Sequence, residues 1–331
     1  MNATDGREER TDLAPKVVAI GGGTGLSTLL RGLKAHTPHL TAIVTVADDG
    51  GSSGRLRREL GVLPPGDFRN CIAALADDEA LITQLFQYRF GQGNGLNGHS
   101  LGNLFITALA GVTGSFERAI LEAGRVLAVR GRILPSTLED VTLVADVRAS
   151  AAPDKAPALA RVQGESLIPK AGQPIERIFL RPEGVRAYPE AVRAILEADL
   201  IVAGPGSLFT SVLPNLLVDD IRRAVGASSA LKLYVCNVAT QPGETDGFDV
   251  GQHMHALERH VGRGLFPAVL ANNNMLAGPV PPGMQMVALY DPSGAGYRVM
   301  AADLVDSAAC WRHDSAKLAR QVLHYYDSQR R

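Results

Sequence analysis

A cluster of glycines between two apolar runs carries the first residues that could bind a ligand. The run Val17–Ile20 is typical of a strand, and leucines at helical spacing begin at Leu26. Glycines let the backbone approach a ligand closely, and the free N–H groups and dipole of a helix start attract an anion, usually a phosphate. The sequence therefore predicts a phosphate-binding turn at Gly22, Gly23, Thr24 and Gly25.

This turn differs from the two best-known glycine-rich phosphate loops. The dinucleotide pattern G-x-G-x-x-G needs a third glycine where the chain has Leu26 or Thr28, so a Rossmann dehydrogenase loses support. A P-loop is excluded, because no lysine followed by serine or threonine closes the turn. A turn that only packs a helix against a sheet is the alternative, although helix starts in doubly wound sheets commonly bind ligands.

Two carboxylates follow the second predicted strand, Leu40–Ala47. Asp48 and Asp49 come directly after it and should lie beside the glycine turn. Either one could accept a hydrogen bond from a ligand hydroxyl, or the two could hold Mg²⁺ while a phosphoryl-linked group is transferred. Arg55, Arg57 and Arg58 are expected on a glycine-rich loop beside this site, where they either pair with phosphates or form a solvated surface.

Further polar residues are expected around this site. Arg69 follows a Pro-Pro-Gly turn, and a helix is expected to start directly after it. Asn103 lies in the first turn of another helix, where it serves either capping and packing or ligand contact. Arg312 precedes the last helix, with Asp314 or Ser315 as N-cap, and it either reaches an anion or lies on the surface.

A second strand, turn and helix follow in the later half of the chain. Asp199–Ala203 is typical of a buried strand, and a turn with Gly204, Gly206 and Ser207 leads from it into a helix. Its backbone N–H groups and hydroxyls fall at the carboxyl edge of the same sheet as the first turn. The two turns could therefore bracket one ligand.

The next strand also ends in polar residues. Leu231–Asn237 leads through Asn237 into a polar loop that contains Thr240. The helix predicted over Val250–Val261 holds three histidines but lacks the zinc motif H-E-x-x-H. These histidines are therefore expected to be surface or packing residues.

Together these elements predict an α/β fold, a three-layer sandwich around a mainly parallel, Rossmann-like sheet. We expect a disordered tail at residues 1–15 and a single domain at 16–330. Short β-type runs between 124 and 181 indicate a β-rich insertion that crosses the edge of the main sheet. Its strands are expected at Arg125–Val129, Thr142–Val147, Glu165–Ile168 and Ile175–Leu180, with a loop at Ala149–Pro157.

The composition restricts the partners and the compartment. The 331 residues carry a net charge of −1, which gives no overall electrostatic reason for nucleic-acid or membrane binding. No apolar run reaches the roughly 18 residues of a membrane helix, and the N-terminus lacks the apolar core of a signal peptide. The three cysteines are far apart and lack metal-ligand spacing, so we expect reduced thiols in a cytoplasmic protein.

Six motifs in this order resemble the YvcK-type proteins, called gluconeogenesis factors, of the CofD-like superfamily. The resemblance covers nearly the whole chain from Lys16 onward, and it departs at the N-terminal tail and in the loop at Ala149–Pro157. The motif Thr210–Pro214 is shared with CofD, whereas Gly51–Arg57 is closer to the YvcK type. The motifs are Gly21–Leu26, Ala47–Arg57, Pro65–Asn70, Gly204–Ser211, Tyr234–Asp246 and Arg312–Asp314.

The resemblance implies a cytoplasmic bacterial protein that binds UDP-sugars, notably UDP-N-acetylglucosamine, and is needed for cell shape and envelope synthesis during gluconeogenic growth. We expect no required cofactor, although Mg²⁺ is possible, and we expect protein partners in envelope synthesis and a homo-oligomer. CofD itself transfers a 2-phospholactyl group onto a deazaflavin precursor with the help of a metal ion. A transferase with Mg²⁺ at Asp48 and Asp49 is therefore the alternative, and the sequence does not decide whether a reaction is catalysed.

The residues expected to bind the ligand come from both turns, both carboxylates and the surrounding polar positions. They are Gly22, Gly23, Thr24, Gly25, Asp48, Asp49, Arg69, Asn103, Gly204, Gly206, Ser207, Asn237, Thr240 and Arg312.

Overall fold

The computed structural model describes residues 14–76, 81–149, 159–289 and 296–330. In this part of the chain the largest element is a seven-stranded sheet with all its strands parallel, in the order β10-β9-β8-β7-β1-β2-β3. Its strands are β1 (Val17–Gly21), β2 (Leu40–Val44), β3 (Arg132–Pro135), β7 (Leu200–Ala203), β8 (Leu231–Val235), β9 (Ala268–Asn272) and β10 (Arg298–Ala302).

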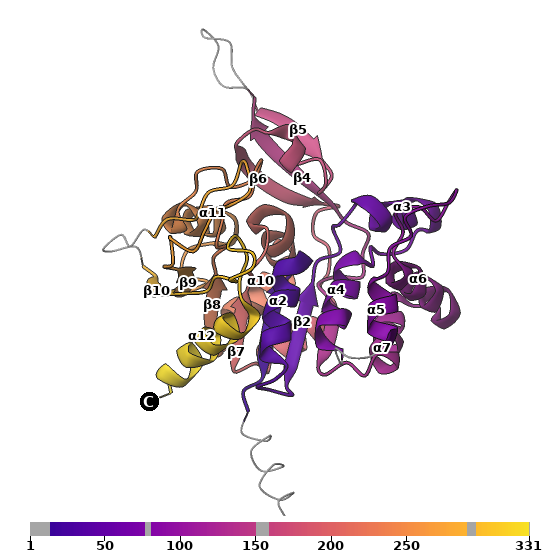
Figure 1. The fold of residues 1–331 in the computed structure, drawn as a ribbon, viewed down its shortest axis with the longest axis horizontal. Helices are drawn as coiled ribbons and strands as arrows, with labels where there is room; N and C mark the ends of the chain where they lie inside the picture. The colour runs from indigo at the N-terminus through magenta and orange to yellow at the C-terminus, as the bar shows by residue number, and fades with distance from the viewer. Residues whose placement is uncertain (1–13, 77–80, 150–158, 290–295, 331) are drawn as a thin grey trace, which may run out of the picture.

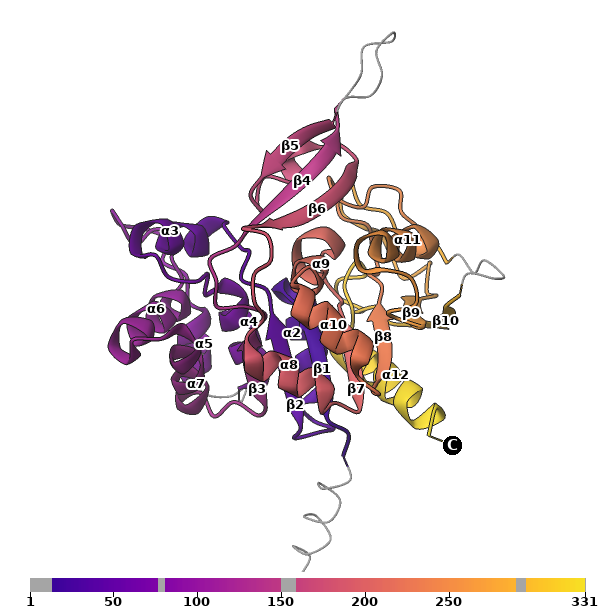
Figure 2. The same ribbon diagram turned by 180° about the vertical axis from the view of Figure 1, so that it is seen from behind.

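Helices cover both faces of this sheet. One face carries α2 (Gly23–Leu33), α4 (Gly66–Leu75) and α12 (Ser315–Ser328), which lie in front of the strands in Figure 1. The opposite face carries α8 (Pro189–Leu196) and α10 (Asp219–Ala227), which lie in front in Figure 2. The other helices are α3 (Gly51–Leu60), α5 (Leu81–Gln87), α6 (Leu101–Thr113), α7 (Phe116–Val126), α9 (Leu213–Leu216), α11 (Val250–Val261), and the short η1 (Pro169–Ala171) and η2 (Leu208–Val212).

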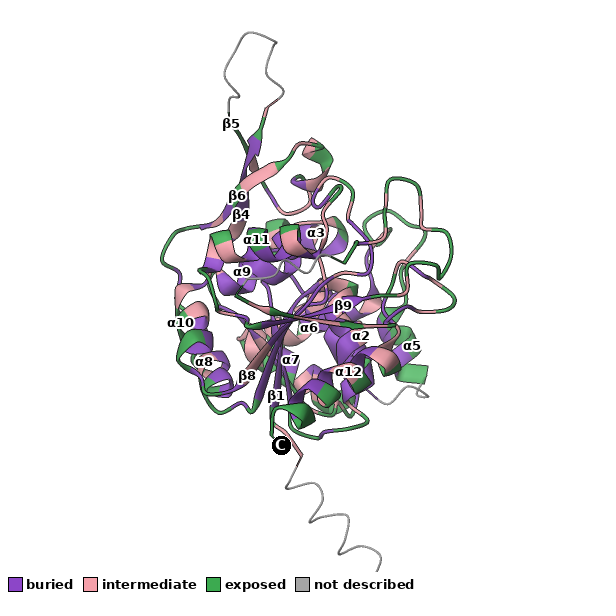
Figure 3. Cartoon of the chain, turned by 90° about the vertical axis from the view of Figure 1, so that its left-hand side faces the viewer, coloured by how far each residue is buried: buried purple, intermediate pink, exposed green. Residues whose placement is uncertain are grey.

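The strand sequences explain why the sheet is the middle layer. Every residue of β1, β2, β7 and β9 is buried, as expected for parallel strands with helices on both faces. Figure 3 shows these buried strands inside the molecule and the exposed residues on the outer sides of the helices. Helix α2 buries its leucines, spaced at helical intervals, between the sheet and its neighbours. The predicted three-layer α/β fold is confirmed.

A separate three-stranded antiparallel sheet stands above the main sheet in Figures 1 and 2. It consists of β4 (Thr142–Arg148), β5 (Leu159–Gln163) and β6 (Ile175–Arg181), in the order β5-β4-β6. The main sheet holds β3, and α7 ends at Val126, so this second sheet begins later than the insertion expected at 124–181.

Two of the predicted insertion strands were wrong. Arg125–Val129 falls at the end of α7, because Ser115 caps that helix and Ala119, Ile120 and Ala123 bury one helical face. Glu165–Ile168 is a turn that leads into η1, and the strand of that region is β5. The turn starts at Gly164, whose φ of 110° ends the strand.

Two predictions near the glycine turn were also wrong. Arg55, Arg57 and Arg58 do not lie on a loop, because α3 begins at Gly51 and continues to Leu60. Helix α4 begins at Gly66, so that Asp67 and Arg69 lie in its first turn rather than before it. Of the two N-cap candidates for α12, Asp314 and Ser315, the structure has Asp314, whose side chain accepts a hydrogen bond from the Lys317 N–H.

Parts of two predictions lie outside the described residues. These are residues 1–13 of the expected tail and residues 150–158, which include most of the expected loop at Ala149–Pro157. Among the helices of the described ranges, none combines the length and the apolar character needed to span a membrane.

Candidate functional site

The candidate site lies where the strand order reverses. From β1 the chain continues to β2 and β3 on one side, and from β7 it continues to β8, β9 and β10 on the other. In open parallel sheets such a switch point leaves a crevice outside the carboxyl ends of the two central strands. A cavity of about 450 Å³ lies there, between the turns that follow β1 and β7.

Most of the predicted ligand-binding residues line this cavity. Four of the predicted residues do not: Asp49, Arg69, Asn103 and Gly204. The residues that do are Gly22, Gly23, Thr24, Gly25, Asp48, Gly206, Ser207, Asn237, Thr240 and Arg312.

The first turn presents an open helix start. Helix α2 begins after Gly22, which provides no side-chain cap, and Gly23 has the positive φ of 63° that favours glycine. The Gly23 N–H donates to the carboxylate of Asp67. This anion already occupies part of the position that the helix start would offer to a phosphate.

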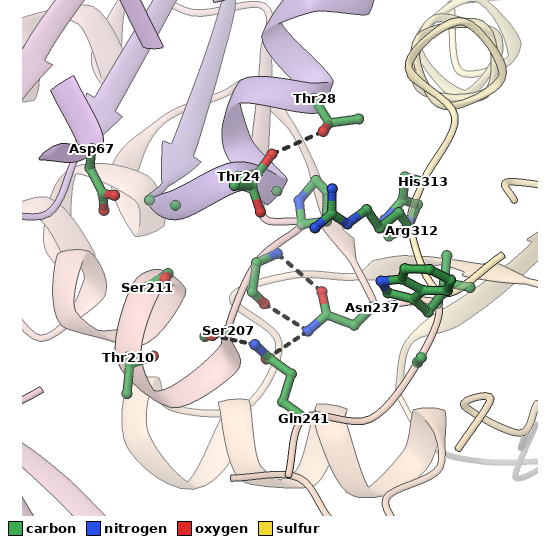
Figure 4. Close-up of a pocket in the computed structure, with 18 of the residues that line it drawn as sticks. Thr24, Thr28, Asp67, Ser207, Thr210, Ser211, Asn237, Gln241, Arg312 and His313 are labelled. Carbon is green, nitrogen blue, oxygen red and sulfur yellow. Dashed lines mark hydrogen bonds between the residues drawn. The ribbon is translucent and has the colours of Figure 1, made fainter. Parts of the chain in front are cut away.

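Two glycines of this turn are required by close packing. A Cβ atom on Gly22 would lie 2.5 Å from Asp67 Oδ2, and one on Gly25 would lie 2.5 Å from the carbonyl oxygen of Pro205. The first turn therefore touches Asp67 on one side and the second turn on the other. Figure 4 shows Asp67 and Arg312 on opposite sides of the start of α2.

The second turn is closed by side chains from the loop that follows β8. Asn237 Oδ1 accepts the Gly206 N–H at 3.1 Å, and Asn237 Nδ2 donates to the Gly206 carbonyl at 2.9 Å. Gln241 accepts from Asn237 Nδ2 and donates to Ser207 Oγ, as the dashed lines in Figure 4 show. Gly204, the first residue of this turn, packs closely against β8, since a Cβ there would lie 2.8 Å from the Val235 carbonyl oxygen.

Three acidic side chains face the cavity from different elements. Burial, followed by the charge of Asp48, raises the pKa of Asp67 to about 7. Burial together with the neighbouring carboxylates raises the pKa of Glu165 to about 8, and burial also raises the pKa of Asp48. This side of the cavity therefore favours protonated carboxyls or a bound cation.

The two adjacent aspartates have different surroundings. Asp48 accepts from the Gly50 N–H at 2.9 Å and lines the cavity. Asp49 instead accepts from the Ser166 N–H at 2.9 Å, and so it joins the main sheet to the turn after β5. The second carboxylate beside Asp48 is that of Asp67.

The segment before α12 closes the remaining side of the cavity. Arg312 is exposed, and its side chain reaches toward the first turn in Figure 4. His313 is buried and lines the cavity; burial lowers its pKa to about 4, so the ring is neutral near pH 7. Its Nε2 atom has no hydrogen-bond partner among the described residues, which leaves an acceptor or donor for a ligand.

Several residues outside the predicted binding set also line the cavity. They are Thr28, Thr45, Asp67, Glu165, Pro205, Thr210, Ser211, Val238, Ala239, Gln241, Met284, Trp311 and His313. Asp67 follows a Pro-Pro-Gly turn, a position that suggests the rim of a site, and it does line the cavity. No local sequence pattern marks Glu165 as a ligand-binding residue, because it reaches the cavity from the turn after β5 of the second sheet.

Two of the three histidines of α11 serve packing, and the third, His255, is exposed. His253 is fully buried, with Nδ1 2.8 Å from the Asp249 carbonyl oxygen, and His260 Nε2 accepts from the Ile178 N–H at 3.0 Å. Across the described ranges, no group of three His, Cys, Asp or Glu side chains could hold a metal ion. The three cysteines are buried and free.

Comparisons with known proteins point to one family. The profile described as 2-phospho-L-lactate transferase CofD matches residues 17–302. The gluconeogenesis factor of Bacillus subtilis is 52% identical over 259 residues, which cover 78% of this chain and 79% of that protein. The gluconeogenesis factor of Halalkalibacterium halodurans is 51% identical over 261 residues, which cover 79% of this chain and 78% of that protein.

A solved structure has the same fold over nearly the whole chain. The crystal structure of a UPF0052-family protein from Bacillus halodurans superposes with a TM-score of 0.85 at 43% sequence identity. The superposition covers 94% of this chain and 99% of that one.

Proposed function

Because this chain belongs to the CofD family, and within it to the YvcK-type gluconeogenesis factors, we propose that it is a regulatory protein that binds UDP-N-acetylglucosamine in the cavity between β1 and β7. Binding would take place in the cytoplasm and regulate envelope synthesis and cell shape during growth on gluconeogenic carbon sources. The regulation would act through protein partners, which respond to the bound form.

The observation that carries this proposal is the open start of α2 opposite an unpaired arginine. The uncapped helix start presents N–H groups to the cavity, and Arg312 makes no ion pair with any described residue. A diphosphate between them would receive backbone hydrogen bonds and a charge-assisted contact. The cavity of about 450 Å³ lies in the range typical of small-molecule sites.

The rest of the cavity supplies groups suited to a nucleoside and a sugar. Asp48 would accept a hydrogen bond from a ligand hydroxyl, whereas Asp49 is already bonded to Ser166. The unpartnered Nε2 of His313 offers one further polar contact. Recognition would shift the equilibrium between two states of the protein only if the ligand binds them with different affinity.

The acidic side of the cavity favours a second candidate, a CofD-like transferase that uses Mg²⁺. Asp48 and Asp67 both face the cavity and have raised pKa values, and bound Mg²⁺ would stabilise their ionised forms. Asp49 fits this role less well, because its carboxylate bonds the Ser166 N–H. Mg²⁺ there would neutralise negative charge on a phosphoryl-linked group.

Isothermal titration of the full chain with UDP-N-acetylglucosamine, with and without Mg²⁺, tests both candidates when it is followed by an assay for released UDP. Saturable binding without Mg²⁺ and with intact ligand supports the regulatory protein. Binding that needs Mg²⁺, together with UDP release, supports the transferase. Absence of binding under both conditions contradicts the proposal.

A further inference from the structure

A second, smaller crevice shares two residues with the cavity described above. It has a volume of about 170 Å³, and Asp48 and Asp67 line both spaces. Its other walls come from the start of α3, the first turn of α4, the segment before α6 and the first turn of α6. Two of the predicted ligand-binding residues, Arg69 and Asn103, lie here rather than in the larger cavity.

Two arginines without ion-pair partners meet at this crevice. Neither Arg69 nor Arg89 forms a salt bridge with any residue of the described ranges. After burial, the charge of Arg89 is the next cause that lowers the pKa of Arg69, whereas the carboxylates of Asp67 and Asp48 in the same crevice raise it by less. Two like charges that converge on one small space are stabilised when an anion lies between them.

Buried polar atoms without partners line the same space. Arg69 is 9% exposed and Asn103 is 2% exposed, yet Arg69 Nε and Asn103 Oδ1 have no hydrogen-bond partner among the described residues. Most buried polar groups in folded proteins are paired, and an unpaired one is costly. Arg69 Nε needs an acceptor, whereas Asn103 Oδ1 needs a donor.

The walls of the crevice are held in place by specific contacts. Arg69 donates to Ser100 Oγ and to Asn70 Oδ1, both at 2.7 Å. Ser52 Oγ lies 2.9 Å from His99 Nδ1 and accepts from Asn103 Nδ2 at 3.1 Å. These bonds fix the donors and acceptors before a ligand arrives, which lowers the entropic cost of binding.

Glycines allow the helices to approach this closely. A Cβ on Gly102 would lie 2.8 Å from Arg69 Cγ, and one on Gly66 would lie 2.5 Å from Ser53 Oγ. Helix α3 starts at the crevice without a side-chain cap, so its first N–H groups add partial positive charge there.

We propose that this crevice binds a phosphate group, either inorganic phosphate or the phosphate of a small monoester, as a second ligand beside the larger cavity. The arginines and the start of α3 supply the positive charge, and Arg69 Nε supplies a donor. A hydrogen phosphate also carries one O–H, which Asn103 Oδ1 would accept. Sulfate has the same shape and charge but no proton to donate, so the crevice should discriminate against it.

Isothermal titration of the full chain at constant ionic strength tests this proposal with three probes: inorganic phosphate, sulfate and glycerol 3-phosphate. We expect saturable binding of inorganic phosphate or glycerol 3-phosphate, and about tenfold weaker binding of sulfate. The probe that binds more tightly identifies the source of the phosphate group. Arg89 is exposed, so Arg89→Ala should fold normally and weaken phosphate binding about tenfold to a hundredfold.

Two other variants complete the test. Arg118→Ala removes an exposed arginine on α7 that lines neither space, so it should leave phosphate affinity unchanged. Arg312→Ala should also leave it unchanged, because Arg312 lines only the larger cavity.

Three results would overturn the proposal: no binding of any probe, equal losses in Arg89→Ala and Arg118→Ala, or a loss confined to Arg312→Ala. The last result would place phosphate at the glycine turn instead. Binding of UDP-N-acetylglucosamine by Arg89→Ala reports separately on the function proposed above.

Discussion

The two glycine-bearing turns at the switch point look alike in sequence and differ in structure. Both follow a buried central strand, and both lead into a helix. The turn after β1 ends in an uncapped helix start, whereas both backbone groups of Gly206 in the turn after β7 are bonded to Asn237. The first turn is therefore open to a ligand, and the second forms a wall.

Because of this difference, substitutions at the two turns should affect different quantities, namely ligand affinity and the free energy of unfolding. A substitution beside the open turn should change ligand affinity, because no N-cap side chain satisfies the N–H groups of the helix start. A substitution in the closed turn should mainly change the free energy of unfolding, because its polar groups are already paired. The residue at which the two turns touch should show this division most strongly.

Gly25→Ala should have the largest effect. Its Cβ would lie 2.5 Å from the Pro205 carbonyl oxygen and 2.8 Å from Gly206 Cα, and backbone atoms cannot move aside as a side chain can. We expect the free energy of unfolding to fall by about 3 kcal/mol, measured by urea denaturation. Gly111→Ala is the matched control: it lies in an exposed part of α6 with nothing near its Cβ, and it should stabilise by roughly 0.5 to 1 kcal/mol. A stable Gly25→Ala protein would contradict the close contact of the turns.

The sequence predicted this pair of turns but not their roles. Strand-turn-helix patterns identified both, and parallel strands brought them to one edge. The sequence of Gly204–Ser207 alone does not show that Asn237, about thirty positions later, forms hydrogen bonds with the backbone of Gly206. Such pairing depends on which strands are neighbours, and local sequence does not encode that.

Arg312→Ala should weaken binding of UDP-N-acetylglucosamine by about 1.5 to 3 kcal/mol, because a charge-assisted contact to a phosphate is lost. The side chain is exposed, so the free energy of unfolding should not change. Arg320→Ala on α12 removes an exposed arginine outside the cavity and should bind normally. Titration calorimetry of both variants measures the difference, and equal affinities would remove Arg312 from the site.

Asp67 should make ligand affinity and stability depend on pH. The pKa of Asp67 in the folded protein is about 7, whereas that of an aspartate in the unfolded chain is near 3.9. At pH values between these two, unfolding therefore releases a proton. Stability therefore falls as pH rises from about 4 to 7, by at most about 1.4 kcal/mol per unit. Ionised Asp67 also competes with a diphosphate for the Gly23 N–H, so ligand affinity should fall as pH rises through 7.

Asp67→Asn tests both effects, and Glu244→Gln is the matched variant beside the second turn. Glu244 also has its pKa raised to about 7 by burial, and it accepts from Thr210 Oγ1, but it does not line the cavity. Between pH 5 and 7, we expect each variant to flatten the stability profile by about 1 to 2 kcal/mol. Only Asp67→Asn should flatten the pH dependence of ligand affinity. An equal loss of the pH dependence of ligand affinity in Glu244→Gln would contradict the assignment of binding to the first turn and stability to the second.

The elements that sequence missed show where local patterns fail. Strand β3 is short and only partly buried, and β10 at the opposite edge is half exposed, so neither has the apolar run of a central strand. Glu165 was assigned to a strand, yet it faces the cavity from a turn that Asp49 holds through the Ser166 N–H. The buried strands of the centre were predictable, whereas the edges and the contacts between the two sheets depend on tertiary structure.

Asn237→Ala should have the smallest effect and tests the closed turn directly. It removes both bonds to Gly206 and the one to Gln241, but water can reach these half-buried groups and replace part of what is lost. We expect the free energy of unfolding to fall by about 1 kcal/mol in urea denaturation. Ligand affinity should fall less than in Arg312→Ala, since the open start of α2 and the arginine remain. If Asn237→Ala binds as weakly as Arg312→Ala while keeping its stability, Asn237 contacts the ligand and the second turn belongs to the binding surface after all.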